Sequence, residues 1–184
     1  MNAESTASAL LVLDVFSTFE FSGGEALFEQ ARRPVERLHL LRQRFHEADR
    51  PVVFVNDNFA RWQDGFDELL AYVAASGWRG KAMVAALRPE SHDFKLLKPR
   101  HSAFFETALP SLLSCLALKR IVVTGLAADS CVLCTVLDAH VRGIEAVVPS
   151  DTTASQTAVR TERALQHLRE TCDIATPPSA DISP

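Results

Sequence analysis

The chain has 184 residues, of which 47% are hydrophobic and 23% charged, so it is long enough to bury a full core without metals or disulfides. Its formal net charge is −4 and it contains no cluster of Lys and Arg, which excludes a general binder of nucleic acid or of anionic membranes. We therefore expect one globular domain over residues 1–184.

The longest apolar runs, ALLVLDVF and RIVVTGLAA, are too short to span a bilayer. The segment MNAESTASA lacks the charged start and the long apolar stretch of a signal peptide. These features predict a cytoplasmic protein that has no membrane partner. Four cysteines do not make a disulfide scaffold in a chain of this size, so in a reducing compartment we expect structural or catalytic thiols.

After a short polar leader, strand patterns alternate with helical patterns along the chain. The predicted order is strand 9–16, helix 23–49, strand 50–57, helix 61–87, strand 92–99, helix 107–118, strand 119–125, helix 129–143, strand 144–151, helix 155–172 and strand 172–176. The helix at 61–87 is expected to be irregular around Gly77 and Gly80, and about residues 177–184 are expected to form a disordered tail.

Apolar strands that alternate with helices predict an α/β fold, in which a mostly parallel sheet is covered by helices on both faces. In that Rossmann-like architecture, sites form at the carboxyl ends of the strands. This rule selects a set of residues that should face one cleft. They are Asp14, Asn56 to Asn58, Lys98, the turn GLAADSC at 125–131, and Asp151.

Three of these residues suggest a reaction. Asp14 interrupts an apolar strand, where an unpaired carboxylate would cost several kcal/mol by desolvation, so it needs a cation such as Lys98. Cys131 opens a predicted helix, and a thiol beside an ammonium group and a helix N-terminus is expected to shift toward the nucleophilic thiolate. Together they form a consistent set for acyl transfer, with Asp14 as the proton carrier.

Each residue taken alone has a structural interpretation. Asp14 can be a hydrogen-bond acceptor, Lys98 a solvated side chain, and Cys131 a buried packing thiol, since free cysteine is among the most buried residue types. The shared position of all three at strand ends on one predicted edge favours the catalytic interpretation.

The chain also resembles the isochorismatase-like cysteine hydrolases, and the resemblance covers nearly its whole length. The segments that carry it are LLVLDVFSTF, VNDNFARW, LKPRHSAFFETALPSLL, IVVTGLAADSCVLCTVLDAHVRG and VVPSDTTAS. The occurrence of Lys-Pro-Arg-x-Ser-Ala-Phe and Gly-x-x-x-x-x-Cys-Val in this order is specific. The resemblance implies a three-layer αβα sandwich with a six-stranded, mostly parallel sheet.

It further implies a triad in which Cys131 attacks a carbonyl carbon, Lys98 favours the thiolate and Asp14 relays protons. Members of the family hydrolyse amides, ureido or carbamoyl groups, so water would clear a thioester intermediate. A non-proline cis peptide is implied between Leu126 and Ala127, with the backbone N–H groups of Ala127 and Cys131 forming an oxyanion hole.

The sequence departs from the family pattern at several positions. Ala128 stands where family members often carry Thr, and Phe16 and Ser17 follow the first strand where Gln or Asn is common. Nicotinamidases have an Asp-x-His pair and a further His after the second strand, whereas here that region reads NDNFARW without a histidine. We therefore predict no catalytic metal and no cofactor, and the chain is closest to metal-free members of unassigned substrate.

Aromatic and polar side chains near the predicted cleft are candidates for contacts with a small-molecule substrate. The candidates are Phe19, Asn58, Trp62, Phe104 and Phe105. The aromatic residues can instead belong to the core, and Asn58 can cap a loop. His101 follows Lys98 closely, but a loop histidine is more often structural or solvated.

Three other functions stay open at this point. A vinyl ether hydrolase of the isochorismatase type would use Asp14 to protonate its substrate. The CVLC segment, with Cys131 and Cys134, has the spacing of a thiol redox motif, although it follows the fourth strand rather than the first. A catalytically silent binding member is a third alternative, whereas a zinc site at CVLC has too few ligands. The resemblance also implies a homo-oligomer.

Overall fold

The computed structural model describes residues 7–184, so most of the predicted polar leader lies outside the described residues. The strands are β1 (Ser8–Leu13), β2 (Val52–Asp57), β3 (Phe94–Lys98), β4 (Arg120–Leu126), β5 (Glu145–Val147) and β6 (Thr153–Ala154). The α-helices are α1 (Gly24–Glu47), α2 (Phe66–Ser76), α3 (Trp78–Leu87), α4 (Leu109–Cys115), α5 (Leu133–Val141) and α6 (Ala158–Cys172). A π-helical turn (Ala128–Val132) precedes α5, and a 3-10 turn (Ser179–Asp181) follows α6.

All strand pairs in the sheet are parallel, and the strand order is β3-β2-β1-β4-β5, with β6 pairing to the end of β4. β1 lies in the middle of this order, and all six of its residues are buried. Leu13, its last residue, pairs with Val55 of β2 and Gly125 of β4, so three strands end side by side. The predicted six-stranded parallel α/β fold is confirmed.

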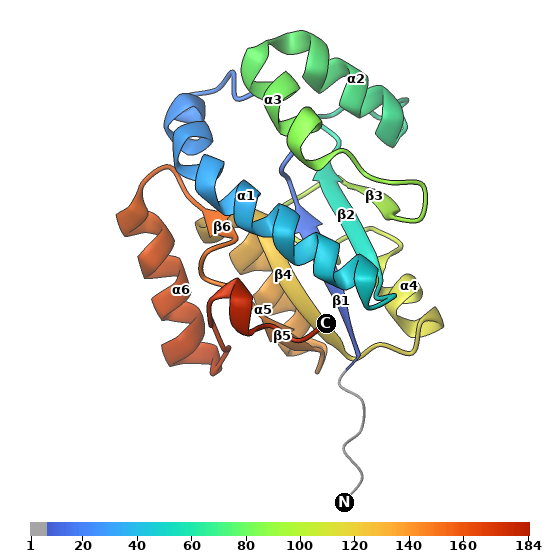
Figure 1. Cartoon of the computed structure of the whole chain (residues 1–184), viewed down its shortest axis with the longest axis vertical. Helices are drawn as coiled ribbons and strands as arrows, with labels where there is room; N and C mark the ends of the chain where they lie inside the picture. The colour runs from blue at the N-terminus through green and yellow to red at the C-terminus, as the bar shows by residue number, and fades with distance from the viewer. Residues whose placement is uncertain (1–6) are drawn as a thin grey trace, which may run out of the picture.

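Helices cover both faces of the sheet (Figure 1), and an apolar core lies on each face. Leu10 and Val12 of β1 pack in the core that contains side chains of α1, α2 and α3. Leu11 and Leu13 point to the opposite core, to which α4, α5 and α6 contribute. The alternation of side chains along β1 therefore creates the three layers.

Two predicted elements differ from the structure. The helix expected over 61–87 is two helices, because the backbone turns at Gly77 and α3 packs back on α2. Gly80 allows that close approach, since a Cβ atom there would lie 2.3 Å from the carbonyl oxygen of Val73. The sixth strand is β6, whereas the expected strand at 172–176 contributes a single bridge between Ala175 and Val147.

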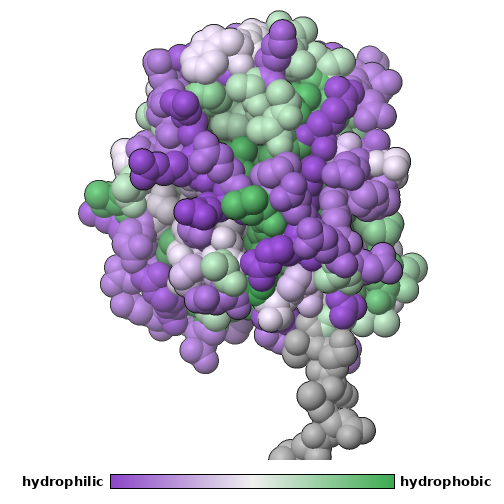
Figure 2. Space-filling view, in the orientation of Figure 1, coloured by the Kyte–Doolittle hydropathy of each residue, from purple (hydrophilic) through white to green (hydrophobic). Residues whose placement is uncertain are grey.

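The visible surface is mainly hydrophilic. Figure 2 shows hydrophobic residues gathered near the top of the molecule, over α2 and α3, and otherwise in small groups among hydrophilic ones. Among the described residues, no helix combines the length and the apolar character that crossing a membrane requires.

The C-terminal segment is packed, in contrast to the disordered tail expected over 177–184. The Asp151 carboxylate accepts hydrogen bonds from the backbone N–H and the hydroxyl of Ser179, at 2.7 and 2.9 Å. The Arg44 guanidinium donates to the carbonyl oxygens of Ser179 and Ile182. Ile182 is only 2% exposed, because it fills a position in the core beside α1. The polar composition of the segment predicted disorder, whereas the burial of the single side chain of Ile182 anchors it to the core.

We predict that Ile182→Ala lowers the free energy of unfolding by about 2 kcal/mol or more, because it leaves a cavity in the core. Urea titration of the full chain measures this change. Val159→Ala, at a position 59% exposed on α6, is the matched control and should change stability by less than about 0.5 kcal/mol. Equal changes in the free energy of unfolding for the two substitutions would show that the side chain of Ile182 does not stabilise the core.

Candidate active site

Asp14 follows β1 directly and turns the chain out of the sheet. Its backbone has φ of 47°, a left-handed conformation that aspartate tolerates better than most residues. One carboxylate oxygen, Oδ1, accepts a hydrogen bond of 2.6 Å from the backbone N–H of Asp57, at the end of β2. The neighbouring strand therefore fixes the direction in which the carboxylate points.

Lys98 is the last residue of β3, and its side chain is fully buried. Its ammonium nitrogen lies 2.7 Å from Asp14 Oδ2 and donates to the carbonyl oxygen of Arg100 at 3.0 Å. The third neighbour is the Cys131 sulfur, 3.5 Å away. An ammonium group has three protons to donate, and these three partners surround it. The structure thus brings the Asp14 carboxylate and the Cys131 sulfur together at the Lys98 ammonium nitrogen.

Cys131 lies in the π-helical turn between β4 and α5, a type of turn that is frequent at functional sites. The peptide bond from Leu126 to Ala127 is cis, as predicted. Gly125, with φ of +103°, allows β4 to end close against β1, because a Cβ atom there would lie 2.0 Å from the carbonyl oxygen of Leu13. This glycine therefore lets the π-helical turn that carries Cys131, called the thiol turn below, lie close to Asp14.

The thiol turn is also held by contacts with the segment between β6 and α6 and with α6 itself. Asp129 accepts hydrogen bonds from the Ser155 hydroxyl and from Arg160 Nε. Burial alone would raise the pKa of Asp129, but these hydrogen bonds lower it, so the carboxylate is ionised at neutral pH. Asp129 therefore ties the thiol turn to the beginning of α6.

The groups around Cys131 act in opposite directions on the pKa of its thiol. Burial, followed by the negative charge of Asp14, raises the pKa of the Cys131 thiol to about 12, and the nearby Lys98 charge does not offset this. Burial beside a carboxylate therefore favours the protonated thiol, and it opposes the shift toward the thiolate that Lys98 and the helix N-terminus favour.

The other two groups titrate as a pair. Burial raises the pKa of Asp14 despite the opposing charge of Lys98. Burial alone would lower the pKa of Lys98, but the negative charges of Asp14 and Cys131 raise it above its ordinary value. Lys98 therefore stays charged, and Asp14 is a stronger base than an exposed aspartate.

A pocket of about 420 Å³ opens above the cluster. Asp14 and Cys131 line it, together with Ala127, Ser130 and His101, whose Nδ1 atom lies 4.0 Å from the Cys131 sulfur. The remaining lining residues are Ser17, Phe21, Leu27, Asp57, Phe59, Leu126, Asp129, Gln156 and Arg160. Apolar side chains form much of the wall, and charged groups gather at the thiol.

Sequence reasoning chose the wrong aromatic residues for this wall. Phe19 and Phe104 are 2% and 3% exposed and belong to the two cores, Phe19 beside Phe28 and Phe104 under the Arg142 guanidinium. Phe21 and Phe59 line the pocket instead. Phe59 closely follows the end of β2, so the strand-end rule could have found it, whereas no signal in the sequence separates Phe21 from the buried Phe19.

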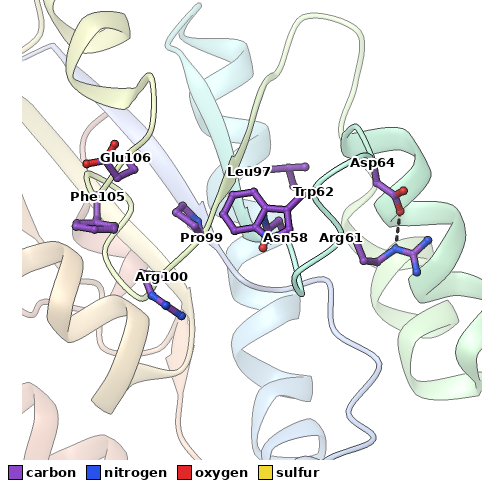
Figure 3. A pocket seen from close by; sticks show the side chains of 9 residues that line it. All are labelled: Asn58, Arg61, Trp62, Asp64, Leu97, Pro99, Arg100, Phe105 and Glu106. Carbon is purple, nitrogen blue, oxygen red and sulfur yellow. Dashed lines mark hydrogen bonds and ion pairs between the residues drawn. The ribbon is translucent and has the colours of Figure 1, made fainter.

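Asn58, Trp62 and Phe105 lie outside the thiol pocket, in a neighbouring hollow of about 700 Å³ (Figure 3). There the indole of Trp62 lies near Leu97 and Asn58, while Phe105 comes from the segment after β3. None of the triad residues lines this hollow. The hollow that Trp62 lines is therefore separate from the pocket that contains the Cys131 sulfur.

The remaining strand-end residues have structural contacts. Asn56 is buried and exchanges hydrogen bonds with the backbone of Phe16, which fixes the segment after β1. Asp151 holds the C-terminal segment and does not line the thiol pocket. Cys134 lies one turn after Cys131 in α5, and it too is absent from the pocket wall. The sequence analysis did not select Gln156 and Arg160, although both follow β6 closely in the chain.

The fold and this cluster have counterparts in known proteins. Residues 8–177 match the model of the isochorismatase domain. The uncharacterized isochorismatase family protein YaaI of Bacillus subtilis (strain 168) is 34% identical over 157 residues, which cover 85% of this chain and 86% of YaaI. The chain therefore belongs to the isochorismatase family, and it is an isochorismatase-family hydrolase.

More distant matches include enzymes whose names state a reaction. Ureidoacrylate amidohydrolase RutB of Methylorubrum extorquens is 37% identical over 86 residues, covering 47% of this chain but only 35% of RutB. The crystal structure of N-carbamoylsarcosine amidase from Thermoplasma acidophilum has a TM-score of 0.72 at 23% identity, covering 97% of this chain and 99% of that one. An isochorismatase family protein from Desulfovibrio vulgaris has a TM-score of 0.76 at 23% identity, with 95% of each chain covered. These two structures show the shared fold.

The raised pKa of the Cys131 thiol predicts its alkylation behaviour. Below that pKa, the rate of reaction with iodoacetamide should rise about tenfold per pH unit between about pH 8 and pH 11, because only the thiolate reacts. Asp14→Asn should speed the reaction at about pH 8, since it removes a negative charge that disfavours the thiolate. Lys98→Ala should slow it, since it removes a positive charge.

Mass spectrometry of the alkylated peptides resolves the four thiols, and the exposed Cys115 is the internal reference. A Cys131 rate that is already independent of pH in mildly alkaline buffer would contradict the raised pKa. An unchanged rate in Asp14→Asn would show that the carboxylate charge does not control the thiol.

Proposed function

We propose that the protein is a metal-independent cysteine amidohydrolase that cleaves the C–N bond of a small amide, ureido or carbamoyl compound. The observation that carries the proposal is the placement of Lys98 Nζ, which lies 2.7 Å from Asp14 Oδ2 and 3.5 Å from the Cys131 sulfur, beneath the pocket. A base, a cation and a nucleophile thus share one site. The amidohydrolase and amidase names of its relatives support the same class.

In the first step, the Cys131 sulfur attacks the substrate carbonyl carbon and its proton passes to Asp14. The raised pKa of Asp14 makes the carboxylate a suitable acceptor, and the charged Lys98 keeps it ionised before the substrate binds. Lys98 itself gives up no proton. It stabilises the negative charge that moves between the carboxylate, the sulfur and the substrate.

In the second step, the C–N bond breaks and Asp14 returns the proton to the leaving nitrogen, which departs as ammonia or an amine. A thioester on Cys131 is left behind. Water then attacks the thioester and passes a proton to Asp14, and the proton returns to the sulfur as the acid product leaves. The thiol and the carboxylate are restored, so the cycle balances.

Negative charge develops on the substrate oxygen in both steps. We propose the backbone N–H groups of Ala127 and Cys131 as the oxyanion hole, because both residues line the pocket around the sulfur. The pocket volume of about 420 Å³ and its apolar wall of Phe21, Leu27 and Phe59 favour a small substrate with an apolar portion.

We also propose a homo-oligomeric state, from the family resemblance, and a cytoplasmic location, from the sequence patterns described above. Light scattering of the purified chain measures its mass in solution, and fractionation of the source cells measures its location.

The first prediction concerns turnover. On a substrate found by screening carbamoyl amino acids, ureido acids and simple amides for ammonia release, Cys131→Ala should reduce the rate to that of the uncatalysed reaction. Asp14→Asn should lower kcat by about 100- to 10,000-fold, because it removes the proton carrier. Cys134→Ala is the control and should keep activity, since Cys134 is absent from the pocket wall. Full activity of Cys131→Ala would refute the proposal, and equal loss in Cys134→Ala would favour a dithiol mechanism.

The second prediction concerns the intermediate. Acid quenching during turnover should leave the acyl group of the substrate on the peptide that contains Cys131, detected as a mass increase. A vinyl ether hydrolase that works by protonation would leave this peptide unmodified. Turnover without any acylated Cys131, in several substrates that react slowly enough to trap, would therefore exclude the thioester mechanism.

A further inference from the structure

A second cluster of titratable side chains lies beside the amino-terminal end of β3, whereas the thiol lies at the carboxyl ends of the strands. His46 is in the last turn of α1, while Glu90 and His92 are in the loop between α3 and β3. One ligand-type atom of each residue lies within 4.8 Å of those of the other two. Lys98 and this loop stand at opposite ends of β3, so the cluster is separate from the active site.

Asp93 orients the histidine in this cluster. Its carboxylate is fully buried and accepts a hydrogen bond of 2.7 Å from His46 Nε2. Its second oxygen accepts the backbone N–H of Glu90 at 2.7 Å. Because a carboxylate can only accept, His46 Nε2 carries the proton, and in the neutral ring Nδ1 then has a free lone pair. This arrangement of carboxylate, histidine and ligand site is common around metal ions in proteins.

The free nitrogen faces the other potential ligands. His46 Nδ1 lies 3.7 Å from Glu90 Oε1, and the rings of His46 and His92 meet edge to face with centroids 4.4 Å apart. A tetrahedral zinc ion with bonds of about 2.0 to 2.2 Å needs ligand atoms about 3.4 Å apart. Glu90 and His92 are exposed, so small rotations of their side chains can complete that geometry.

The charges of the cluster also favour a cation. Glu90 and Asp93 supply two carboxylates, while Arg42 supplies one guanidinium, 3.0 Å from Glu90. Arg42 also donates to the carbonyl oxygens of Leu87 and Arg88, so it is fixed at the end of α3. The Asp93 carboxylate is buried, so a cation bound beside it would be attracted by its negative charge.

We propose that His46 Nδ1, Glu90 and His92 bind a divalent transition-metal ion of the zinc class, with water completing the coordination. Two imidazoles and one carboxylate are suited to Zn²⁺ rather than to Ca²⁺ or Mg²⁺. The ion joins the end of α1 to the loop before β3. It stabilises the fold at this point and takes no part in the reaction at Cys131.

The test uses the full chain, freed of metal by a chelator and titrated with zinc sulfate. Calorimetry should show one ion per chain, and zinc at about 100 times its Kd should raise Tm by about 5 °C or more. His92→Ala and Glu90→Gln should each weaken binding at least tenfold. Both residues are exposed, so these variants keep the fold, whereas His46→Ala would leave the buried Asp93 unpaired.

Two control variants locate the ion. His167→Ala removes an exposed histidine of α6 and should bind zinc as the parent does. Cys131→Ser should also keep zinc binding, because the proposed ligands lie beside the amino-terminal end of β3. An absence of zinc binding in the parent would overturn the proposal. Loss of binding in Cys131→Ser together with full binding in His92→Ala would overturn it in favour of the catalytic thiol.

Discussion

The ion pair between Lys98 and Asp14 is the interaction on which the site depends. The Lys98 ammonium group is fully buried, and burying two charges is favourable only when their geometry is good and their remaining hydrogen bonds are made. Here the strand ends supply those bonds, through the N–H of Asp57 and the carbonyl of Arg100. The parallel register of β1, β2 and β3 is therefore what makes this pair stable in a buried position.

The same pair influences the protonation state of the Cys131 thiol. A thiol that is buried beside a carboxylate holds its proton, and the pKa of Cys131 rises to about 12. In the mechanism that we propose, the carboxylate that causes part of this rise is also the group that accepts the thiol proton. A protonated thiol reacts more slowly with oxidants and electrophiles than a thiolate does.

Sequence reasoning succeeded where one rule of chain geometry acts directly. Apolar strands that alternate with helices require a covered parallel sheet, and in such a sheet Asp14 and Lys98 end on one edge with the turn of Cys131. It failed where side-chain direction decides the outcome. Phe19 and Phe21 are two residues apart, yet one lies in the core and the other lines the pocket, because the chain after Asp14 no longer alternates as a strand does. The packed tail was missed for a similar reason, since only the structure shows the place that Ile182 fills.

The central position of β1 has a consequence for how the molecule is made. β1 pairs with β4, and the Thr124 hydroxyl reaches the carbonyl of Leu11 across 113 residues of sequence. Contacts between segments so far apart form only after a long loop has closed. A chain that still lacks β4 and the turn of Cys131 therefore cannot hold the assembled cluster of Asp14, Lys98 and Cys131. The chemistry of the site is thus a property of the finished chain, acquired at a late stage of its folding.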